Sequence, residues 1–232
     1  MNTPSPVHPH GDVRRMVRSL VLLGVLVFGA LATAVALASA QAAAGDAAKG
    51  KAIYDKVCVT CHGPQAGGNK ALAAPALWQQ EGWYMVAQLQ KFKSGARGSH
   101  PKDTQGAQMK AMVVQLTDDA AIANVVAHIK TLKGTAPTAE LKGGDAAAGK
   151  ATYTKVCAAC HGPAAKGMQA LKAPALAGQA DWYMKAQLDK FRTGVRGADP
   201  RDVTGAQMKG MAVSLPNDQA VLDVVTYIAT LK

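Results

Sequence analysis

The sequence contains one short pattern twice: two cysteines separated by two residues and followed directly by a histidine. These two motifs use all four cysteines of the chain, so none remains for a disulfide. The copies are Cys58-Val59-Thr60-Cys61-His62 and Cys157-Ala158-Ala159-Cys160-His161.

This spacing is the attachment site of a c-type haem. Two thiols one helical turn apart can each form a thioether with one vinyl group of the porphyrin, and the following histidine is carried under the iron. We therefore expect two covalently bound haem c groups, attached through Cys58, Cys61, Cys157 and Cys160. His62 and His161 are the expected axial iron ligands on one side.

Two other uses of a C-x-x-C pair fit less well. A zinc site would need two further ligands, and the sequence has no second cluster of cysteine or histidine to supply them. A thioredoxin-like dithiol would need alternating strands, and no strand-like alternation stands out. The haem interpretation is therefore favoured.

The two motifs belong to a tandem repeat. Shifted by 99 residues, residues 45–133 align with 144–232 without a gap, and about 53 of the 89 paired positions are identical. Each copy has the size of a small single-core domain. Residues 134–143 are polar, with glycine at both ends and one proline, and we interpret them as a linker between two domains.

Within each copy the pattern favours helices, so we predict an all-α fold. Asp46 and Asp145 are candidate N-caps of a first helix that runs into the haem motif. Apolar residues recur at helical spacing in a second helix, as Met85, Leu89 and Phe92 show. This second helix is expected at 83–93 and 182–192, and a last helix at about 118–133 and about 216–232, with Pro216 in the first turn of the latter.

The N-terminal residues resemble a targeting segment. Three arginines, Arg14, Arg15 and Arg18, precede an apolar run over residues 20–37 and the small-residue sequence Ala38-Ser39-Ala40. This order is typical of a secretory signal peptide, which we place at residues 1–40. The alternative is an uncleaved membrane anchor at 20–40, nearly the ~20 residues that a span needs. Export to the bacterial periplasm is the expectation.

Charge restricts the possible partners. The formal net charge of +11 falls to about +9 when the three arginines and Asp12 of residues 1–40 are removed. A moderately basic exported protein favours redox partners with acidic docking surfaces, or association with an anionic membrane surface. Nucleic acid is not an expected partner, because the sequence has no nucleic-acid-binding motif.

A second axial ligand should appear in both copies. His100 pairs with Asp199 and His128 with Tyr227, so neither histidine is shared, and we interpret both as ordinary surface or helix residues. The two copies share three methionine pairs: Met85/Met184, Met109/Met208 and Met112/Met211. The first pair lies on a helical apolar stripe, where packing is the default role. The other two pairs lie in glycine-flanked segments that could form a loop near the iron, and local pattern does not decide between them.

Residues 45–232 resemble the dihaem cytochrome c4 class, in which two class I cytochrome c domains follow one another. The resemblance rests on both haem motifs, on Pro75 and Pro174, on the Gln-Leu-x-x-Phe pattern of the second helix, and on a methionine seven residues before a leucine. It implies Met109 and Met208 as the second axial ligands and core positions for Met112 and Met211. It also implies that the carbonyl groups of Pro75 and Pro174 accept hydrogen bonds from His62 and His161. Six polar-tipped residues shared by the two copies could bind haem propionates, or could equally pack in the core or lie at the surface: Trp83, Tyr84, Arg97, Trp182, Tyr183 and Arg196.

Iron held by histidine and methionine has no open coordination site, which predicts an electron carrier and not an enzyme. The resemblance implies transfer from a quinol-oxidising cytochrome bc complex to a terminal haem–copper oxidase. Two alternatives remain. The chain could be the electron-accepting cytochrome subunit of a periplasmic dehydrogenase. A dihaem peroxidase is less favoured, because both copies keep a methionine at the same offset.

Overall fold

The computed structural model describes residues 45–231, which belong to one compact unit, Gly45–Lys232. The expected signal peptide at 1–40 and the alternative anchor at 20–40 lie outside the described residues. Within residues 45–231 the regular structure is helical apart from two isolated β-bridges, which confirms the all-α prediction. No helix in this part of the chain combines the length and the apolar character that crossing a membrane requires.

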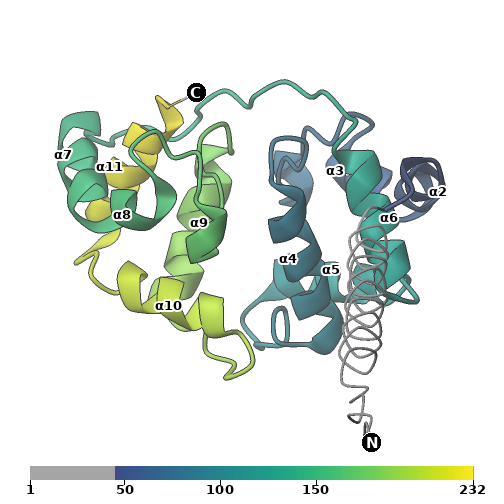
Figure 1. Ribbon diagram of the computed structural model, residues 1–232. Helices are drawn as coiled ribbons and strands as arrows, with labels where there is room; N and C mark the ends of the chain where they lie inside the picture. Colours follow the sequence, from purple (N-terminus) through teal and green to yellow (C-terminus); the bar gives the residue numbers. More distant parts are fainter. Residues whose placement is uncertain (1–44, 232) are drawn as a thin grey trace, which may run out of the picture. The chain divides into compact units, whose positions relative to one another are not determined.

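The same series of helices occurs in each repeat (Figure 1). In the first repeat they are α2 (Ala47–Ile53), a π-helical turn (Tyr54–Cys58), α3 (Val59–His62), a short 3-10 turn (Lys70–Leu72), α4 (Gly82–Ser94), α5 (Thr104–Val113) and α6 (Asp119–Ile129). In the second they are α7 (Ala146–Thr152), a π-helical turn (Tyr153–Cys157), α8 (Ala158–His161), a 3-10 turn (Gln169–Leu171), α9 (Asp181–Arg192), α10 (Val203–Ala212) and α11 (Asp218–Ala229).

The haem motif follows a helix that is capped as expected but is not uniform. The Asp46 side chain accepts hydrogen bonds from the amides of Ala48 and Lys49 at 2.9 and 3.1 Å. Before the motif the chain widens into a π-helical turn, whose buried Tyr54 donates from its hydroxyl to the Gly63 carbonyl at 2.6 Å. A π-helical turn is a local departure from regular α-helix that often marks a functional site. Tyr153 repeats the contact with Gly162 at 2.7 Å.

The first and last helices of each repeat cross at a glycine. A side chain at Gly50 would place its Cβ 1.9 Å from the Asn124 carbonyl oxygen of α6, and one at Gly149 would meet the Asp223 oxygen of α11 at the same distance. The backbones therefore approach as closely as only glycine allows. Behind the crossing lies the core of each repeat, whose most buried side chains include Ile122 and Val125 or Val221 and Val224.

Two expectations are corrected by the structure. The glycine-flanked segment expected to be a loop contains helix α5, capped by Asp103, which accepts from the Gly106 amide at 3.0 Å. Glycine lowers helix propensity, but a strong cap and packing against α4 outweigh that cost. Pro216 lies before α11 and not in its first turn, because Asn217 provides the N-cap and accepts from the Ala220 amide.

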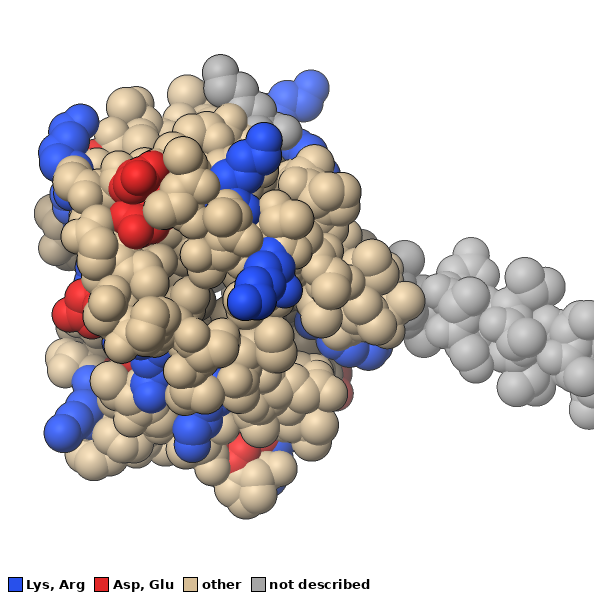
Figure 2. All heavy atoms as spheres, turned by 90° about the vertical axis from the view of Figure 1, so that its left-hand side faces the viewer, with Lys and Arg blue, Asp and Glu red and all other residues tan. Residues whose placement is uncertain are grey.

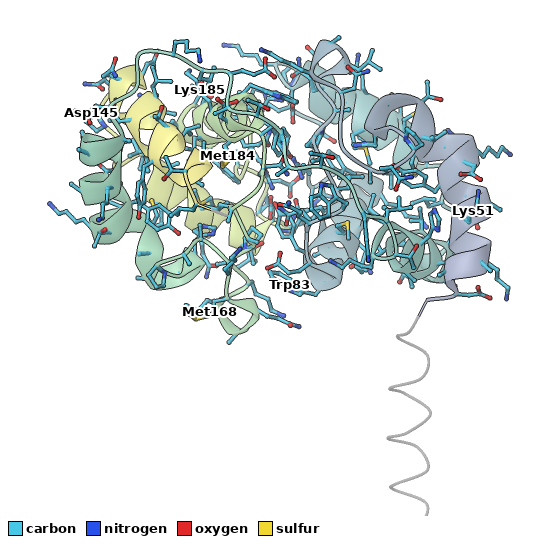
Figure 3. The ribbon with its side chains drawn as sticks, turned by 90° about the horizontal axis from the view of Figure 1, so that it is seen from above. Lys51, Trp83, Asp145, Met168, Met184 and Lys185 are labelled. Carbon is cyan, nitrogen blue, oxygen red and sulfur yellow. The ribbon has the colours of Figure 1, made fainter. Side chains whose placement is uncertain are left out.

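The two repeats meet along α4 and α9, which face each other in Figure 1. In the view from above, Lys51 and Asp145 lie at opposite outer sides and Trp83 lies nearer the middle (Figure 3). Contacts across the boundary are reciprocal: the Gln80 side chain donates to the Ala175 carbonyl and the Gln179 side chain to the Ala76 carbonyl, each at 3.0 Å. The boundary thus has approximate two-fold symmetry.

Candidate functional site

One continuous cavity, lined by both repeats, collects the residues that the sequence singled out. Every predicted attachment, ligand and supporting residue borders it, although these residues come from distant parts of the chain. They are Cys58, Cys61, His62, Pro75, Met109, Cys157, Cys160, His161, Pro174 and Met208.

The two motif histidines are held by backbone carbonyls. Nδ1 of His62 lies 2.9 Å from the Pro75 oxygen, and Nδ1 of His161 lies 2.8 Å from the Pro174 oxygen. A carbonyl only accepts, so Nδ1 carries the proton and Nε2 is left with a free lone pair. Burial lowers the pKa of both imidazoles, against the opposing effect of these hydrogen bonds, which favours the neutral form that metal binding requires.

None of the four motif cysteines forms a disulfide. Burial, together with the neighbouring Cys61, raises the pKa of Cys58 to about 12, and burial with Cys160 raises that of Cys157 to about 11. Both side chains are therefore protonated at neutral pH. With haem present, the sulfur of each motif cysteine would hold a former vinyl carbon of the porphyrin through a thioether bond.

Three methionines of the first repeat border the cavity. Met85 is buried on α4, whereas Met109 and Met112 lie on α5 and are half-buried, with Met109 packed against the core. In the second repeat, Met211 is 44% exposed, which is more than expected of a core residue.

The two unshared histidines lie away from the cavity lining. His100 is in a turn. His128 is buried on α6, with its ring centroid 5.5 Å from that of Tyr54, so it is a core residue of a helix and not a surface one.

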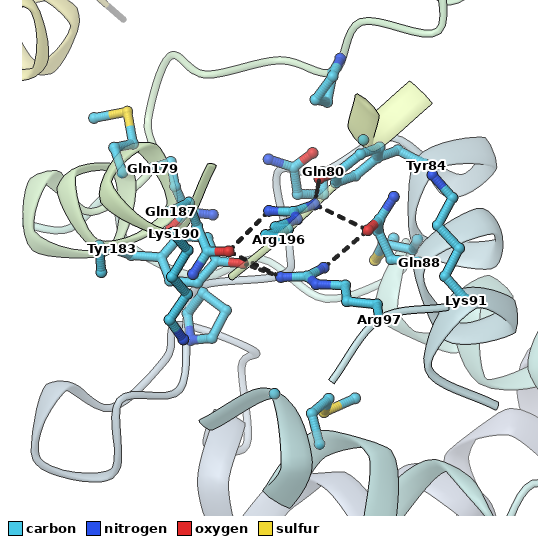
Figure 4. A pocket seen from close by; sticks show the side chains of 18 of the residues that line it. Gln80, Tyr84, Gln88, Lys91, Arg97, Gln179, Tyr183, Gln187, Lys190 and Arg196 are labelled. Atoms are coloured by element: carbon cyan, nitrogen blue, oxygen red, sulfur yellow. Dashed lines mark hydrogen bonds between the residues drawn. The ribbon is translucent and has the colours of Figure 1, made fainter. Parts of the chain in front are cut away.

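A network of buried and half-buried polar side chains crosses the boundary between the repeats beside the cavity (Figure 4). Arg97 donates to Gln88 of its own repeat at 2.9 Å and to Gln187 of the other at 3.1 Å. Arg196 does the same in mirror fashion, to Gln187 at 2.8 Å and Gln88 at 3.0 Å. Each arginine also reaches the tyrosine hydroxyl of the opposite repeat, Tyr183 or Tyr84.

Each of the two arginines has one buried donor atom without a partner among the described residues. Within residues 45–231, Nε of Arg97 and Nε of Arg196 are buried and have no hydrogen-bond partner, although both side chains line the cavity. An unpaired buried donor is costly, so a native site is expected to supply an acceptor. The carboxylates of haem propionates have the right charge and geometry for a guanidinium. Together with paired thiols and neutral histidines, these donors make the cavity fit for haem c.

Sequence reasoning missed the charged pairs that join the repeats. Lys91 of α4 pairs with Asp202, and Lys190 of α9 pairs with Asp103, at 2.5 and 2.6 Å. Both pairs are largely buried. The sequence did contain a signal, because the lysine and the aspartate both recur after 99 residues. Charged residues that only face solvent would have been free to differ between the two copies.

Comparison with known proteins identifies the family of the chain. The family model of cytochrome c matches residues 47–133 and again 146–232. The chain is 34% identical to a thiosulfate dehydrogenase electron acceptor of Stutzerimonas stutzeri (strain A1501), over 84% of this chain and 90% of that protein. It is 33% identical to cytochrome c4 of Thiocapsa roseopersicina, over 82% and 97%.

Among solved structures, the crystal structure of reduced recombinant cytochrome c4 from Pseudomonas stutzeri superimposes with a TM-score of 0.64 and 27% identity. The match covers 82% of this chain and 100% of that one. Two cytochrome c units with paired C-x-x-C-H sites carry two covalently bound haem c groups, and such a protein transfers electrons. The chain therefore belongs to the cytochrome c family, as a tandem dihaem member of the cytochrome c4 class.

Proposed function

We propose that residues 45–133 and 144–232 are two domains, joined by residues 134–143, that each close both axial positions of one haem iron. His62 and Met109 are the ligands in the first domain, and His161 and Met208 in the second. When bound, each haem supplies a one-electron Fe(III)/Fe(II) couple. The proposal is supported by the position of all four side chains around one cavity and by the carbonyl groups that fix each imidazole.

The chain's own residues then have separate tasks. Pro75 and Pro174 hold the tautomer of each histidine, so that Nε2 is available to the metal. Arg97 and Arg196 offer unpaired donors to the propionates and offset their charge. The thioether sulfur of a methionine favours Fe(II) and raises the potential relative to bis-histidine iron. With no open site for oxygen or peroxide, the protein acts as a carrier and not as an enzyme.

As a carrier, the protein passes single electrons between exported redox proteins in the periplasm, from a quinol-oxidising cytochrome bc complex to a terminal haem–copper oxidase. Its basic character suits partners with acidic docking surfaces. On the face turned toward the viewer in Figure 2, basic side chains are spread widely and acidic ones occupy fewer places. Encounters of this kind are brief and have small interfaces. Their rates should fall as ionic strength rises.

Exposure of the dithionite-reduced protein to carbon monoxide tests the closed coordination. We expect no shift of the Soret band at neutral pH. Rapid formation of a carbon monoxide complex at either iron would overturn the carrier assignment and revive a peroxidase.

A second partner is favoured by one comparison. The relative from Stutzerimonas stutzeri carries the name thiosulfate dehydrogenase electron acceptor. Two mixtures distinguish the candidate electron donors. Oxidised protein is mixed either with membranes of the source organism and a quinol, or with periplasmic extract of the same organism and thiosulfate. The proposal predicts catalysed reduction by membranes, and reoxidation by the same membranes in air. Reduction by thiosulfate and extract alone would favour the dehydrogenase.

A further inference from the structure

The two repeats differ at one position that lies beside a haem-histidine contact. Glu81 precedes helix α4, and the equivalent residue before α9 is Ala180. Glu81 occupies the N-cap position, yet its side chain makes no capping hydrogen bond to its own helix. It reaches across the boundary instead, and its two carboxylate oxygens lie 3.2 and 3.1 Å from the amide nitrogen of Ala175 in the second repeat.

That amide belongs to a particular peptide group. The nitrogen of Ala175 is bonded to the carbonyl carbon of Pro174, and the oxygen of the same carbonyl accepts the hydrogen bond from His161 at 2.8 Å. A chain of two hydrogen bonds through one peptide unit therefore runs from the Glu81 carboxylate to the imidazole of His161. The chain joins one repeat to the axial histidine of the other.

The first repeat lacks this arrangement. Among residues 45–231 no hydrogen bond from the Ala76 amide, the counterpart of Ala175, is found. The glycines beside the two peptides show the same difference. A Cβ at Gly167 would lie 2.7 Å from a Glu81 oxygen, whereas one at Gly68 would meet only backbone. A cavity borders both Ala76 and Ala180. The short side chain of Ala180 therefore leaves open the space that an equivalent of Glu81 would fill.

The physical effect has a definite sign. A carboxylate that accepts from a peptide N–H pushes electron density toward the carbonyl oxygen, which strengthens that oxygen as an acceptor. A stronger acceptor draws the Nδ1 proton of His161 and makes the imidazole a better donor to iron. Better donation and the nearby negative charge both stabilise Fe(III).

We propose that Glu81 is a positioning residue that lowers the reduction potential of the second haem relative to the first, by acting across the domain boundary through the Pro174–Ala175 peptide. The inference rests on the proposed ligation of His161. It gives two domains with nearly the same sequence around the haem a built-in difference in potential. It also means that separating the domains would change the second haem without touching its own residues.

Spectroelectrochemical titration of the holoprotein tests the proposal, in two backgrounds that identify the steps. Met109→His lowers the potential of the first haem, so that the high-potential step reports the second, and Met208→His does the reverse. Glu81→Gln keeps the shape and removes the charge. In the Met109→His background we expect Glu81→Gln to raise the reduction potential of the second haem. The expected change is about threefold to tenfold in the equilibrium constant for reduction of Fe(III) to Fe(II), where tenfold corresponds to 59 mV for one electron. In the Met208→His background the high-potential step should not move.

Two further variants keep the test specific. Gln80→Ala removes the neighbouring hydrogen bond across the same boundary without changing charge, and should leave the second potential almost unchanged. Ala180→Glu places a carboxylate at the mirror position and should lower the first potential. As a readout independent of potential, the Ala175 amide proton of the reduced protein should move upfield in the NMR spectrum of Glu81→Gln.

The outcomes separate this inference from the proposed function. If the unaltered protein shows two one-electron steps and sulfur-ligated iron, but Glu81→Gln shifts neither the second potential nor the Ala175 amide, the inference is overturned and the carrier function stands. An equal shift produced by Gln80→Ala would also overturn it, because the effect would then be structural. If the unaltered protein lacks sulfur-ligated iron, the proposed ligands themselves fail.

Discussion

Lys190 of α9 donates from Nζ to the Asp103 carboxylate of the other repeat at 2.6 Å. Asp103 is also the N-cap of α5, the helix that carries Met109, and it accepts from the Gly106 amide at 3.0 Å. One buried carboxylate therefore fixes both the start of the methionine helix and the boundary between repeats. Lys91 and Asp202 repeat the arrangement for the helix of Met208.

This relationship predicts that the boundary supports methionine ligation in the opposite repeat. Lys190→Met keeps a side chain of similar length but removes the cation that pairs with Asp103, whose side chain is only 3% exposed. We expect the free energy of unfolding to fall by about 3 kcal/mol, at the low end for a broken buried pair because Lys190 is itself partly exposed. Guanidinium titration of the sulfur-to-iron band should show the Met109 band lost before that of Met208.

The matched control is Lys185→Met, which removes an ion pair with Asp189 on the same helix and outside the boundary. Its effect should stay below about 1 kcal/mol. Simultaneous loss of both sulfur bands in Lys190→Met would contradict the assignment of Asp103 to the first haem alone.

The glycine at each helix crossing is expected to be indispensable. Gly50→Ala forces a Cβ to within 1.9 Å of a backbone oxygen, and overpacking of this kind costs about 1–3 kcal/mol or more. Gly149→Ala should destabilise the second repeat in the same way. Thermal unfolding followed by circular dichroism measures both. Gly210→Ala has open space on α10 and should be neutral or stabilise by up to about 1 kcal/mol; equal loss in all three would refute the crossing argument.

The buried arginines should tune both haems electrostatically. Arg97→Gln removes a positive charge beside the cavity, so the Fe(III) state gains stability and the potential should fall, by an amount on the order of 1 kcal/mol per electron. Potentiometric titration gives the shift. Arg201→Gln, whose side chain is exposed and pairs with Asp199, is the control and should leave the potentials in place. A rise in potential in Arg97→Gln would show that the guanidinium does not face the propionates.

Much of the fold could be predicted because the repeat presents each signal twice. The helices near 83–93 and 182–192 followed from the spacing of Met85, Leu89 and Phe92, and Asp46 and Asp145 cap their helices as expected. Helix α5 was missed because its glycines and polar residues give no clear helical pattern. Its N-cap, Asp103, is held by contacts with both the Gly106 amide and Lys190, and the second of these depends on the other repeat.

The boundary between repeats could not be read from local pattern. Gln88 and Lys91 on α4, and Arg97 just after its end, are ordinary polar residues until a second copy covers them. Their recurrence after 99 residues was the available signal. Glu81 lacked even that signal, since Ala180 stands at the mirror position, and its contact with Ala175 depends entirely on how the two repeats pack.

The central claim is that each iron is held by a histidine and a methionine, so that only electrons enter and leave. Spectroelectrochemical titration of the mature holoprotein tests it most directly, with the weak band at the red end of the visible spectrum reporting sulfur on ferric haem. We predict two one-electron steps, with half of this band lost in Met109→Ala, the other half lost in Met208→Ala, and the whole band kept in Met112→Ala and Met211→Ala. Loss of the band in the Met112 or Met211 variants, or its absence from the unaltered protein, would contradict the account.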